Sequence, residues 1–280
     1  MNNFTKRLVF GIVYVLLIVL ATVTNVYAFY GLFFIFMLFS IYEFQKMIQL
    51  KSCIPYIVGI MFVISSFTTQ LGEIAFKNIA IKNIIFMISV LVIFFSFIIS
   101  LFNENKIAVK FIGKVSITIL YIIIPFLFLL NTPELSHPTS YKIILGIFIL
   151  TWTSDTFAYL VGRQFGKHKL FERISPKKTI EGFAGGVIFT LIASYIISIY
   201  FVETALFQWI VIAIIISIFG VIGDLVESMF KRQANVKDSS KLIPGHGGFL
   251  DRLDSIIFAI PFIYGFLYIT NNLNLLLNVS

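Results

Sequence analysis

The stretch from Gly223 to Ser255 reads GDLVESMFKRQANVKDSSKLIPGHGGFLDRLDS and is the longest polar interval in a chain that is otherwise mostly apolar. Four of the five aspartates of the chain lie within it, namely Asp224, Asp238, Asp251 and Asp254. The same stretch carries lysines, arginines, a histidine and closely spaced glycines. Carboxylates, cations and flexible glycines in one interval indicate a site for charged ligands, around which the rest of the chain is organised.

The composition outside this stretch is that of an integral membrane protein. Hydrophobic residues make up 59% of the 280 residues and charged residues only 12%, whereas about a quarter of residues are charged in soluble proteins. Long apolar runs without polar alternation predict an all-α, polytopic membrane protein, because a bilayer requires every backbone polar group to be paired. The net charge of +8 is typical of orientation signals and lipid attraction, so we expect no nucleic acid partner. The single cysteine, Cys53, excludes an internal disulfide and a cysteine-based metal site.

Nine apolar segments are long enough to cross a bilayer, at about residues 8–24, 27–44, 54–69, 83–102, 111–130, 143–160, 183–202, 206–226 and 255–271. The first resembles a signal peptide, but we expect it to be retained because no clear cleavage site is present. With a cytoplasmic N-terminus, all of the 21 lysines and arginines fall on the inner side except Lys77, Lys82 and Lys142. This asymmetry predicts about nine transmembrane helices, with the N-terminus cytoplasmic and the C-terminus outside.

These segments divide the chain into two parts. Residues 1–135 form a predicted N-terminal transmembrane scaffold of five helices, which we expect to carry no charged residue within the membrane. Residues 136–280 form a predicted catalytic transmembrane region of four helices. It contains two cytoplasmic loops, at about 161–182 and 227–254, which are rich in charge and glycine. The site is therefore expected on the cytoplasmic side.

Carboxylates recur at helical spacing on either side of the second loop. Two sets of residues occupy positions i, i+3 and i+4 and so share one helical face, namely Asp224, Glu227 and Ser228, and Asp251, Asp254 and Ser255. Oxygen ligands suit Mg²⁺, which typically takes one or two carboxylates together with substrate phosphates. The alternative, solvation of helix ends, fits Asp251 and Asp254 at a helix N-terminus but not Asp224 and Glu227, which are expected at a C-terminus. A metal site is the favoured interpretation.

A further carboxylate, Asp155, lies in the predicted span 143–160, in the run Trp152-Thr153-Ser154-Asp155-Thr156. A carboxylate within a membrane is costly, so we expect Asp155 to face a polar cavity and to have a cationic or metal partner. The alternative is a hydrogen bond between helices, which Ser154 and Thr156 can make without it.

Cations and glycines separate the two carboxylate faces. Gly245, Gly247 and Gly248 provide backbone amides that can approach an anion closely. His246, between glycines, is either structural or a ligand and proton-transfer residue. The positive charges that would bind a polyphosphate come from Lys231, Arg232, Lys237, Lys241 and Arg252.

The loop at 161–182 is also basic, which contact with anionic lipids would explain. It is no P-loop, because His168 stands where Ser or Thr should follow the lysine. The run Ser175-Pro176-Lys177-Lys178-Thr179, followed by Glu181, resembles an N-cap that opens the next helix. The glycines expected at close helix contacts are Gly182, Gly185 and Gly186.

The residues from Ser228 to Asp254 resemble the signature of the phosphatidate cytidylyltransferase family, also called CDP-diacylglycerol synthases. The matching pattern is S-x-F-K-R-x4-K-D-x-S-x2-I-P-x-H-G-G-F-x-D-R-L-D. Upstream, the run from Asp155 to Arg163 and the run from Ser175 to Thr179 resemble a second conserved region of that family. Two departures, Ser240 in place of a frequent glycine and Ile180 in place of a common aromatic residue, touch no expected ligand.

The resemblance implies transfer of CMP from CTP to phosphatidate, giving CDP-diacylglycerol and pyrophosphate. We expect the bacterial cell (inner) membrane as the location, with the endoplasmic reticulum membrane as the alternative if the cell is not bacterial. It implies Mg²⁺, with a second cation left open, and a homodimer as a family-level expectation. We expect the metal ligands among Asp224, Asp251, Asp155, Glu227 and Asp254. The catalytic residues are expected to be Asp224, Asp251, Lys231, Arg232, His246 and Arg252. Substrate binding is expected from Lys237, Asp238, Gly247, Gly248, Lys177, Lys178 and Ser228.

Three other classes of protein compete with this interpretation. A secondary transporter should place acidic residues in both halves, whereas none is expected within the first five helices. A CDP-alcohol phosphatidyltransferase should carry a D-G-x2-A-R motif, which is absent. A lipid kinase that uses CTP is the nearest competitor, because it would need a similar site for metal and nucleotide.

Overall fold

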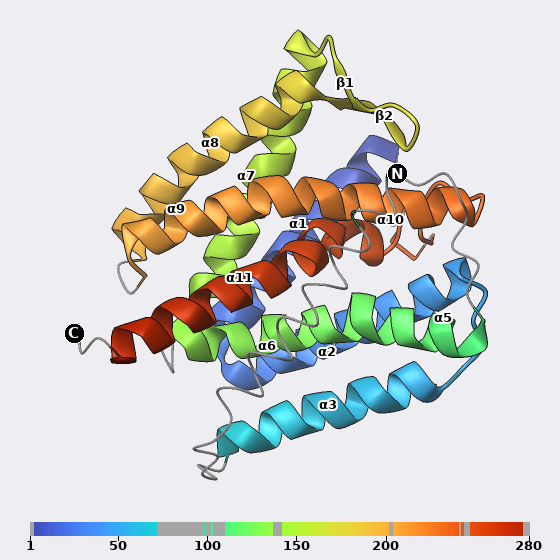
Figure 1. Ribbon diagram of the computed structural model, residues 1–280, viewed down its shortest axis with the longest axis vertical. Helices are drawn as coiled ribbons and strands as arrows, with labels where there is room; N and C mark the ends of the chain where they lie inside the picture. Colours follow the sequence, from blue (N-terminus) through green and yellow to red (C-terminus); the bar gives the residue numbers. More distant parts are fainter. Residues whose placement is uncertain are drawn as a thin grey trace. The chain divides into compact units, whose positions relative to one another are not determined.

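The computed structural model describes residues 3–71, 98, 102, 110–136, 142–201, 204–240, 242–243 and 247–276 (Figure 1). The chain forms two compact units. One comprises Met1–Asn131 and Gln233–Leu253, and the other comprises Thr132–Arg232 and Asp254–Ser280. Much of the polar stretch between Gly223 and Ser255 therefore groups with the N-terminal helices. The functional boundary at residue 135 stays a prediction, and the predicted span 83–102 lies almost entirely outside the described residues.

The first unit is built from apolar helices. These are α1 (Asn3–Thr24), α2 (Val26–Met47), α3 (Ile54–Leu71) and a longer helix, in which α5 (Phe111–Thr118) continues through a π-helical turn (Ile119–Ile123) into α6 (Ile124–Ser136). Asn25 caps α2, because its Oδ1 accepts a hydrogen bond of 2.8 Å from the N–H of Ala28. Aromatic rings fill the interior, where the buried rings of Phe44 and Tyr121 lie 5.2 Å apart.

The second unit contains α7 (Lys142–Phe165), α8 (Ile180–Tyr200) and a helix in which α9 (Leu206–Ile215) continues through a π-helical turn (Ile216–Gly220) into α10 (Val221–Gln233). The part of α11 (Leu250–Leu276) that begins at Asp254 completes it. Figure 1 shows α8 running beside both α7 and α9, in agreement with their contacts.

The contact between α7 and α8 depends on glycine, as the sequence predicted. A Cβ atom on Gly182 would collide with the carbonyl oxygen of Ala158, and one on Gly185 would collide with the side chain of Val161. Small residues at such positions let two membrane helices approach backbone to backbone. The close approach fixes the two helices that carry one wall of the cavity described below.

A short antiparallel hairpin joins α7 to α8, so the expectation of an all-α fold is incomplete. Its strands are β1 (Lys169–Phe171) and β2 (Ser175–Thr179), with Lys169 opposite Thr179. At the end of β2, the Oγ1 of Thr179 accepts a hydrogen bond of 3.1 Å from the N–H of Gly182. This confirms the predicted N-cap, which starts α8 at Ile180.

Among the described residues, six helices are long and apolar enough to cross a membrane. They cover Tyr27–Met47, Phe111–Pro133, Lys142–Phe165, Ile180–Tyr200, Leu206–Gln233 and Leu250–Asn271, and two shorter apolar helices cover Val9–Thr24 and Ile54–Ile64. The six long helices coincide with six of the nine predicted spans and identify an integral membrane protein, and the two shorter ones lie within two further predicted spans. The total of nine spans and the orientation of the termini stay predictions.

Candidate active site

A cavity of about 400 Å³ lies within the second unit. Its walls come from α7, the hairpin, the start of α8 and α10. The charged side chains that line it are Asp155, Arg163, Lys177, Lys178 and Asp224, and apolar lining comes from Ala158, Tyr159, Leu170, Phe183 and Val221. Asp155 therefore lines a cavity that holds other charged side chains, although most of the cavity surface is apolar and not polar as predicted. A cavity with both basic and apolar walls suits a ligand that has an anionic head and an apolar body.

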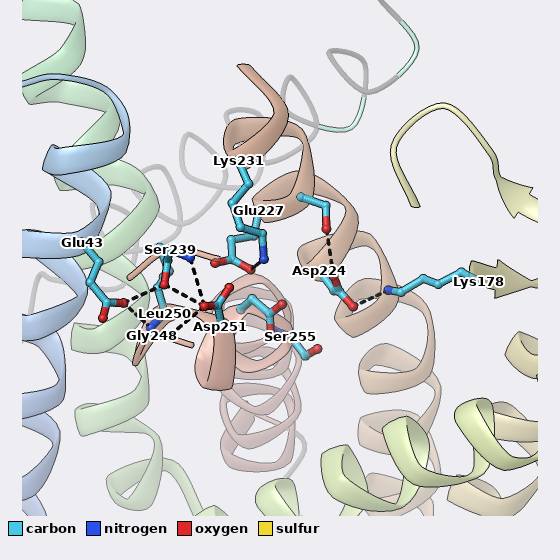
Figure 2. Close-up of polar contacts among 12 residues, drawn as sticks. Glu43, Lys178, Asp224, Glu227, Lys231, Ser239, Gly248, Leu250, Asp251 and Ser255 are labelled. Atoms are coloured by element: carbon cyan, nitrogen blue, oxygen red, sulfur yellow. Dashed lines mark hydrogen bonds and ion pairs between the residues drawn. The ribbon is translucent and has the colours of Figure 1, made fainter. Parts of the chain in front are cut away.

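Asp224 is held in the cavity by contacts with two side chains. The Nζ of Lys178 lies 2.7 Å from its Oδ2, and the hydroxyl of Ser228 donates a hydrogen bond of 3.2 Å to its Oδ1 (Figure 2). Lys178 also donates to the carbonyl oxygen of Val221, 3.4 Å away. The side chains of Lys178 and Asp224 are 24% and 35% exposed, so the ion pair is partly shielded from water and remains open to the cavity. The structure thus brings together three of the predicted site residues.

Glu227 and Lys231 form a second ion pair, at 2.7 Å between Oε2 and Nζ, one turn apart on α10. Both residues are buried. The premise that Asp224 and Glu227 end a helix is wrong, because α10 continues to Gln233 and carries Lys231 and Arg232 in its last turn. The cation one turn further on gives Glu227 a structural explanation that does not require a metal.

A third carboxylate of the second unit, Asp254, is buried and lies close enough to Asp224, Asp155, Lys178 and Lys231 to interact with their charges. Within the described ranges, no three acidic, histidine or cysteine side chains come near enough together to hold an ion by themselves. Mg²⁺ commonly takes only one or two carboxylates and completes its shell with phosphate and water. Asp224 and Asp254 would supply carboxylates of this number, and a Mg²⁺ ion at this place stays a prediction.

Asp251 belongs to the first unit, where it lies in the first turn of α11. Three donors converge on its Oδ2: the N–H and hydroxyl of Ser239, each at 3.0 Å, and the N–H of Gly248, at 2.7 Å (Figure 2). The anion that the Gly248 amide approaches here is thus a carboxylate of the protein. Binding of a substrate phosphate by the Gly248 amide stays a prediction.

Glu43 on α2 is a residue that the sequence reasoning missed. Its side chain is fully buried and accepts hydrogen bonds from the segment between Ser239 and Leu250. The expectation that the first five helices carry no charged residue within the membrane is therefore wrong. A signal was present, because an acidic residue inside the apolar segment 27–44 is by itself an indication of function.

The remaining predicted residues of the polar stretch are less enclosed. Arg232, Lys237, Asp238 and Arg252 are exposed, and Arg232, which belongs to the second unit, does not line its cavity. His246 lies outside the described residues. Gly247 has a φ of 85°, a backbone conformation that favours glycine.

Comparison with known proteins shows which family the chain belongs to. The family model described as "Cytidylyltransferase family" matches residues 5–270. A protein of Staphylococcus haemolyticus (strain JCSC1435) named phosphatidate cytidylyltransferase is 41% identical over 187 residues, which cover 66% of this chain and 68% of that protein. A protein of the same name from Staphylococcus saprophyticus is 39% identical over 186 residues, with the same coverage.

The similarity is strongest over a shorter region. The protein of the same name from Staphylococcus aureus (strain COL) is 52% identical over 120 residues, which cover 42% of this chain and 46% of that protein. The family match, by contrast, extends over nearly the whole chain, from the N-terminal helices to α11. The chain therefore belongs to the cytidylyltransferase family.

Proposed function

We propose that this chain transfers CMP from CTP to phosphatidate. An oxygen of the lipid phosphate attacks the α-phosphorus of CTP, and the bond from that phosphorus to the oxygen bridging to the β-phosphate breaks. CDP-diacylglycerol forms and pyrophosphate leaves. The observation that carries the proposal is the family match over residues 5–270, together with relatives that are named for this activity.

The cavity of the second unit supports the proposal by its charge. Phosphatidate and CTP are both anions and repel one another, so a catalyst must first neutralise them. Arg163, Lys177 and Lys178 line one cavity together with apolar residues. These cations bind the lipid phosphate, and the apolar lining accepts the adjoining part of the lipid. Phosphatidate is already ionised near neutral pH, so its attack requires no general base.

The carboxylates have a separate role in this proposal. Asp224, with Asp155 and Asp254 nearby, would hold Mg²⁺. From the sequence alone, Asp251 is a further candidate ligand. When bound, Mg²⁺ supplies charge neutralisation at the phosphates. Ser228 orients Asp224 by donating to its Oδ1. From the sequence, Lys231, Arg232, Lys237 and Arg252 are further candidates for contacts with the triphosphate.

We place the reaction on the cytoplasmic side of the cell membrane, with the N-terminus cytoplasmic. The distribution of lysine and arginine in the sequence supports this orientation. CTP is available on that side. A homodimer stays an expectation from the family resemblance.

The test follows the label from CTP into lipid. Purified protein in detergent is given phosphatidate, Mg²⁺ and CTP labelled either at the α- or at the γ-phosphorus. The proposal predicts that lipid gains the α-label and never the γ-label, and that omission of phosphatidate abolishes the transfer. Transfer of the γ-label would identify a lipid kinase and refute the proposal.

A further inference from the structure

The carboxylate of Glu43 makes four hydrogen bonds to one segment of the same unit, almost two hundred residues further along the chain. Its Oε1 accepts from the hydroxyl of Ser240 at 2.6 Å and from the N–H of Phe249 at 3.0 Å. Its Oε2 accepts from the hydroxyl of Ser239 at 3.0 Å and from the N–H of Leu250 at 2.8 Å. The N–H groups of Phe249 and Leu250 can only donate, so each oxygen of the carboxylate acts as an acceptor in at least one of these bonds.

The bonds from Phe249 and Leu250 show why a carboxylate is needed at this place. Leu250 begins α11, and the first N–H groups of a helix have no partner within it. A carboxylate from another helix satisfies them and complements the positive end of the helix dipole. Glu43 thus supplies from α2 the cap that a residue next to the helix would ordinarily provide (Figure 2).

An aromatic contact holds the same segment against the same face of α2. The ring of Phe249 stacks on that of Phe39, with 4.7 Å between centroids and 7° between planes, and lies 5.4 Å from that of Phe36. Phe36, Phe39 and Glu43 stand at i, i+3 and i+7, so they share one helical face. The rings provide apolar contact area without direction, whereas the carboxylate fixes the segment through four directional bonds.

Ser239 connects this anchor to Asp251. Its hydroxyl oxygen lies 3.0 Å from Oε2 of Glu43 and 3.0 Å from Oδ2 of Asp251. The hydroxyl has one proton, so it donates to one carboxylate at a time and is shared between them. Gly248 allows this approach, because a Cβ atom there would collide with Ser239 Oγ and Glu43 Oε2. A shift of the Glu43 carboxylate is therefore transmitted to Asp251.

We propose that Glu43 is a positioning residue for the reaction. Through Ser239 and the start of α11, it sets the orientation of the Asp251 carboxylate, which the sequence predicts to be a metal ligand. The N-terminal helices then take part in the chemistry and are not only a scaffold. The inference rests on the proposed function for the reaction that is measured, but its geometry lies entirely within the first unit.

The test uses Glu43→Gln, which keeps the shape of the side chain but removes its charge and turns an amide NH₂ toward N–H donors. Groups that orient a metal ligand typically contribute about 10- to 100-fold to metal affinity or activity. We expect kcat to fall by about that factor, with the Mg²⁺ concentration for half-maximal rate raised several-fold and KM for CTP nearly unchanged. Gln45→Ala is the control, because Gln45 is also buried on α2 but donates to Ser52.

All variants are compared at equal amounts of folded protein, as judged by size exclusion and thermal unfolding in detergent. A purely structural role would reduce the yield of folded protein and leave kcat and the Mg²⁺ requirement of the folded fraction unchanged, which would overturn the inference. If Glu43→Gln does not fold, Ser239→Ala decides, since it removes the shared hydroxyl and leaves the three other bonds to Glu43. It must shift the Mg²⁺ requirement in the same direction.

The design separates this inference from the proposed function. Wild-type protein that makes no CDP-diacylglycerol would refute the function itself. If the wild type is active and neither Glu43→Gln nor Ser239→Ala changes kcat or the Mg²⁺ requirement, only the role of Glu43 is refuted.

Discussion

Replacing Lys178 by methionine tests the ion pair in the cavity. Lys178→Met keeps most of the length of the side chain and removes the charge that lies 2.7 Å from Asp224. In the proposed reaction the same cation screens the phosphate of the incoming lipid. We therefore expect weaker binding of phosphatidate and a lower kcat/KM, with the fold unchanged because the side chain is partly exposed.

The size of the effect is judged from the shielding of Lys178, because its contact with the lipid phosphate would lie in the same partly shielded environment as its ion pair with Asp224. Fully exposed ion pairs contribute about 0.2–1 kcal/mol. Hydrogen bonds to charged groups contribute about 1.5–3 kcal/mol when they are shielded. The side chains here are 24% and 35% exposed, so the upper range applies only in part, and we expect a loss of about 1.5–2.5 kcal/mol. Since about 1.4 kcal/mol corresponds to tenfold, kcat/KM should fall by about 10- to 70-fold.

The Mg²⁺ requirement of Lys178→Met should not rise, although its kcat/KM falls. A positive charge at Lys178 disfavours a divalent cation near Asp224, so its removal should leave the Mg²⁺ concentration for half-maximal rate unchanged or lower it. The assay is the rate of CDP-diacylglycerol formation with phosphatidate and Mg²⁺ varied separately. Lys169→Met is the control, because Lys169 is an exposed cation on the same hairpin that does not line the cavity. A Lys178→Met enzyme with kcat/KM within twofold of the Lys169→Met enzyme would refute this reasoning.

Two further predictions concern glycines. Gly185→Leu should lower the melting temperature in detergent, because the new side chain must displace Val161 and overpacking costs about 1–3 kcal/mol or more. Ala184→Leu is the control, because Ala184 lies on the exposed side of α8 and its replacement should leave the melting temperature unchanged. Equal melting temperatures of the two variants would contradict the close contact between α7 and α8. Gly248→Ala should reduce activity more than tenfold, because its methyl group would collide with Ser239 and Glu43. Gly31→Ala on α2 is the control and should be near neutral, because a Cβ atom there meets nothing within 4 Å. Full activity of Gly248→Ala in the CTP assay would show that the packing around Glu43 is not required.

Local patterns predicted much of the second unit correctly. The periodicity of Asp224 and Ser228 placed both on one face of a helix, and their side chains are in contact. The cap at Thr179 and the close contact at Gly185 were also predictable, because each depends on residues near in sequence or on the size of a single side chain. Hydropathy located the apolar helices because it too depends only on residues that are near in sequence.

Contacts between distant parts of the chain were not predictable in this way. Glu43 appeared as one acidic residue in an apolar run, and no spacing rule connects it with Ser239 and Leu250. The length of α10 was underestimated, because its last turns are polar and hydropathy alone ends the helix too early. The pairing of β1 with β2 was also not predicted, because the loop was interpreted from its basic residues and not as a hairpin.

The most direct test of the central claim measures pyrophosphate and CDP-diacylglycerol in the same reaction. Wild-type protein with CTP, phosphatidate and Mg²⁺ should release one pyrophosphate for each CDP-diacylglycerol formed. Asp224→Asn, folded to the same extent, should form both at least about 100-fold more slowly, because the proposed metal ligand should matter more than the groups that orient such a ligand, whose mutation typically costs about 10- to 100-fold. Release of CDP in place of pyrophosphate, or an Asp224→Asn enzyme with near-normal turnover, would contradict the account.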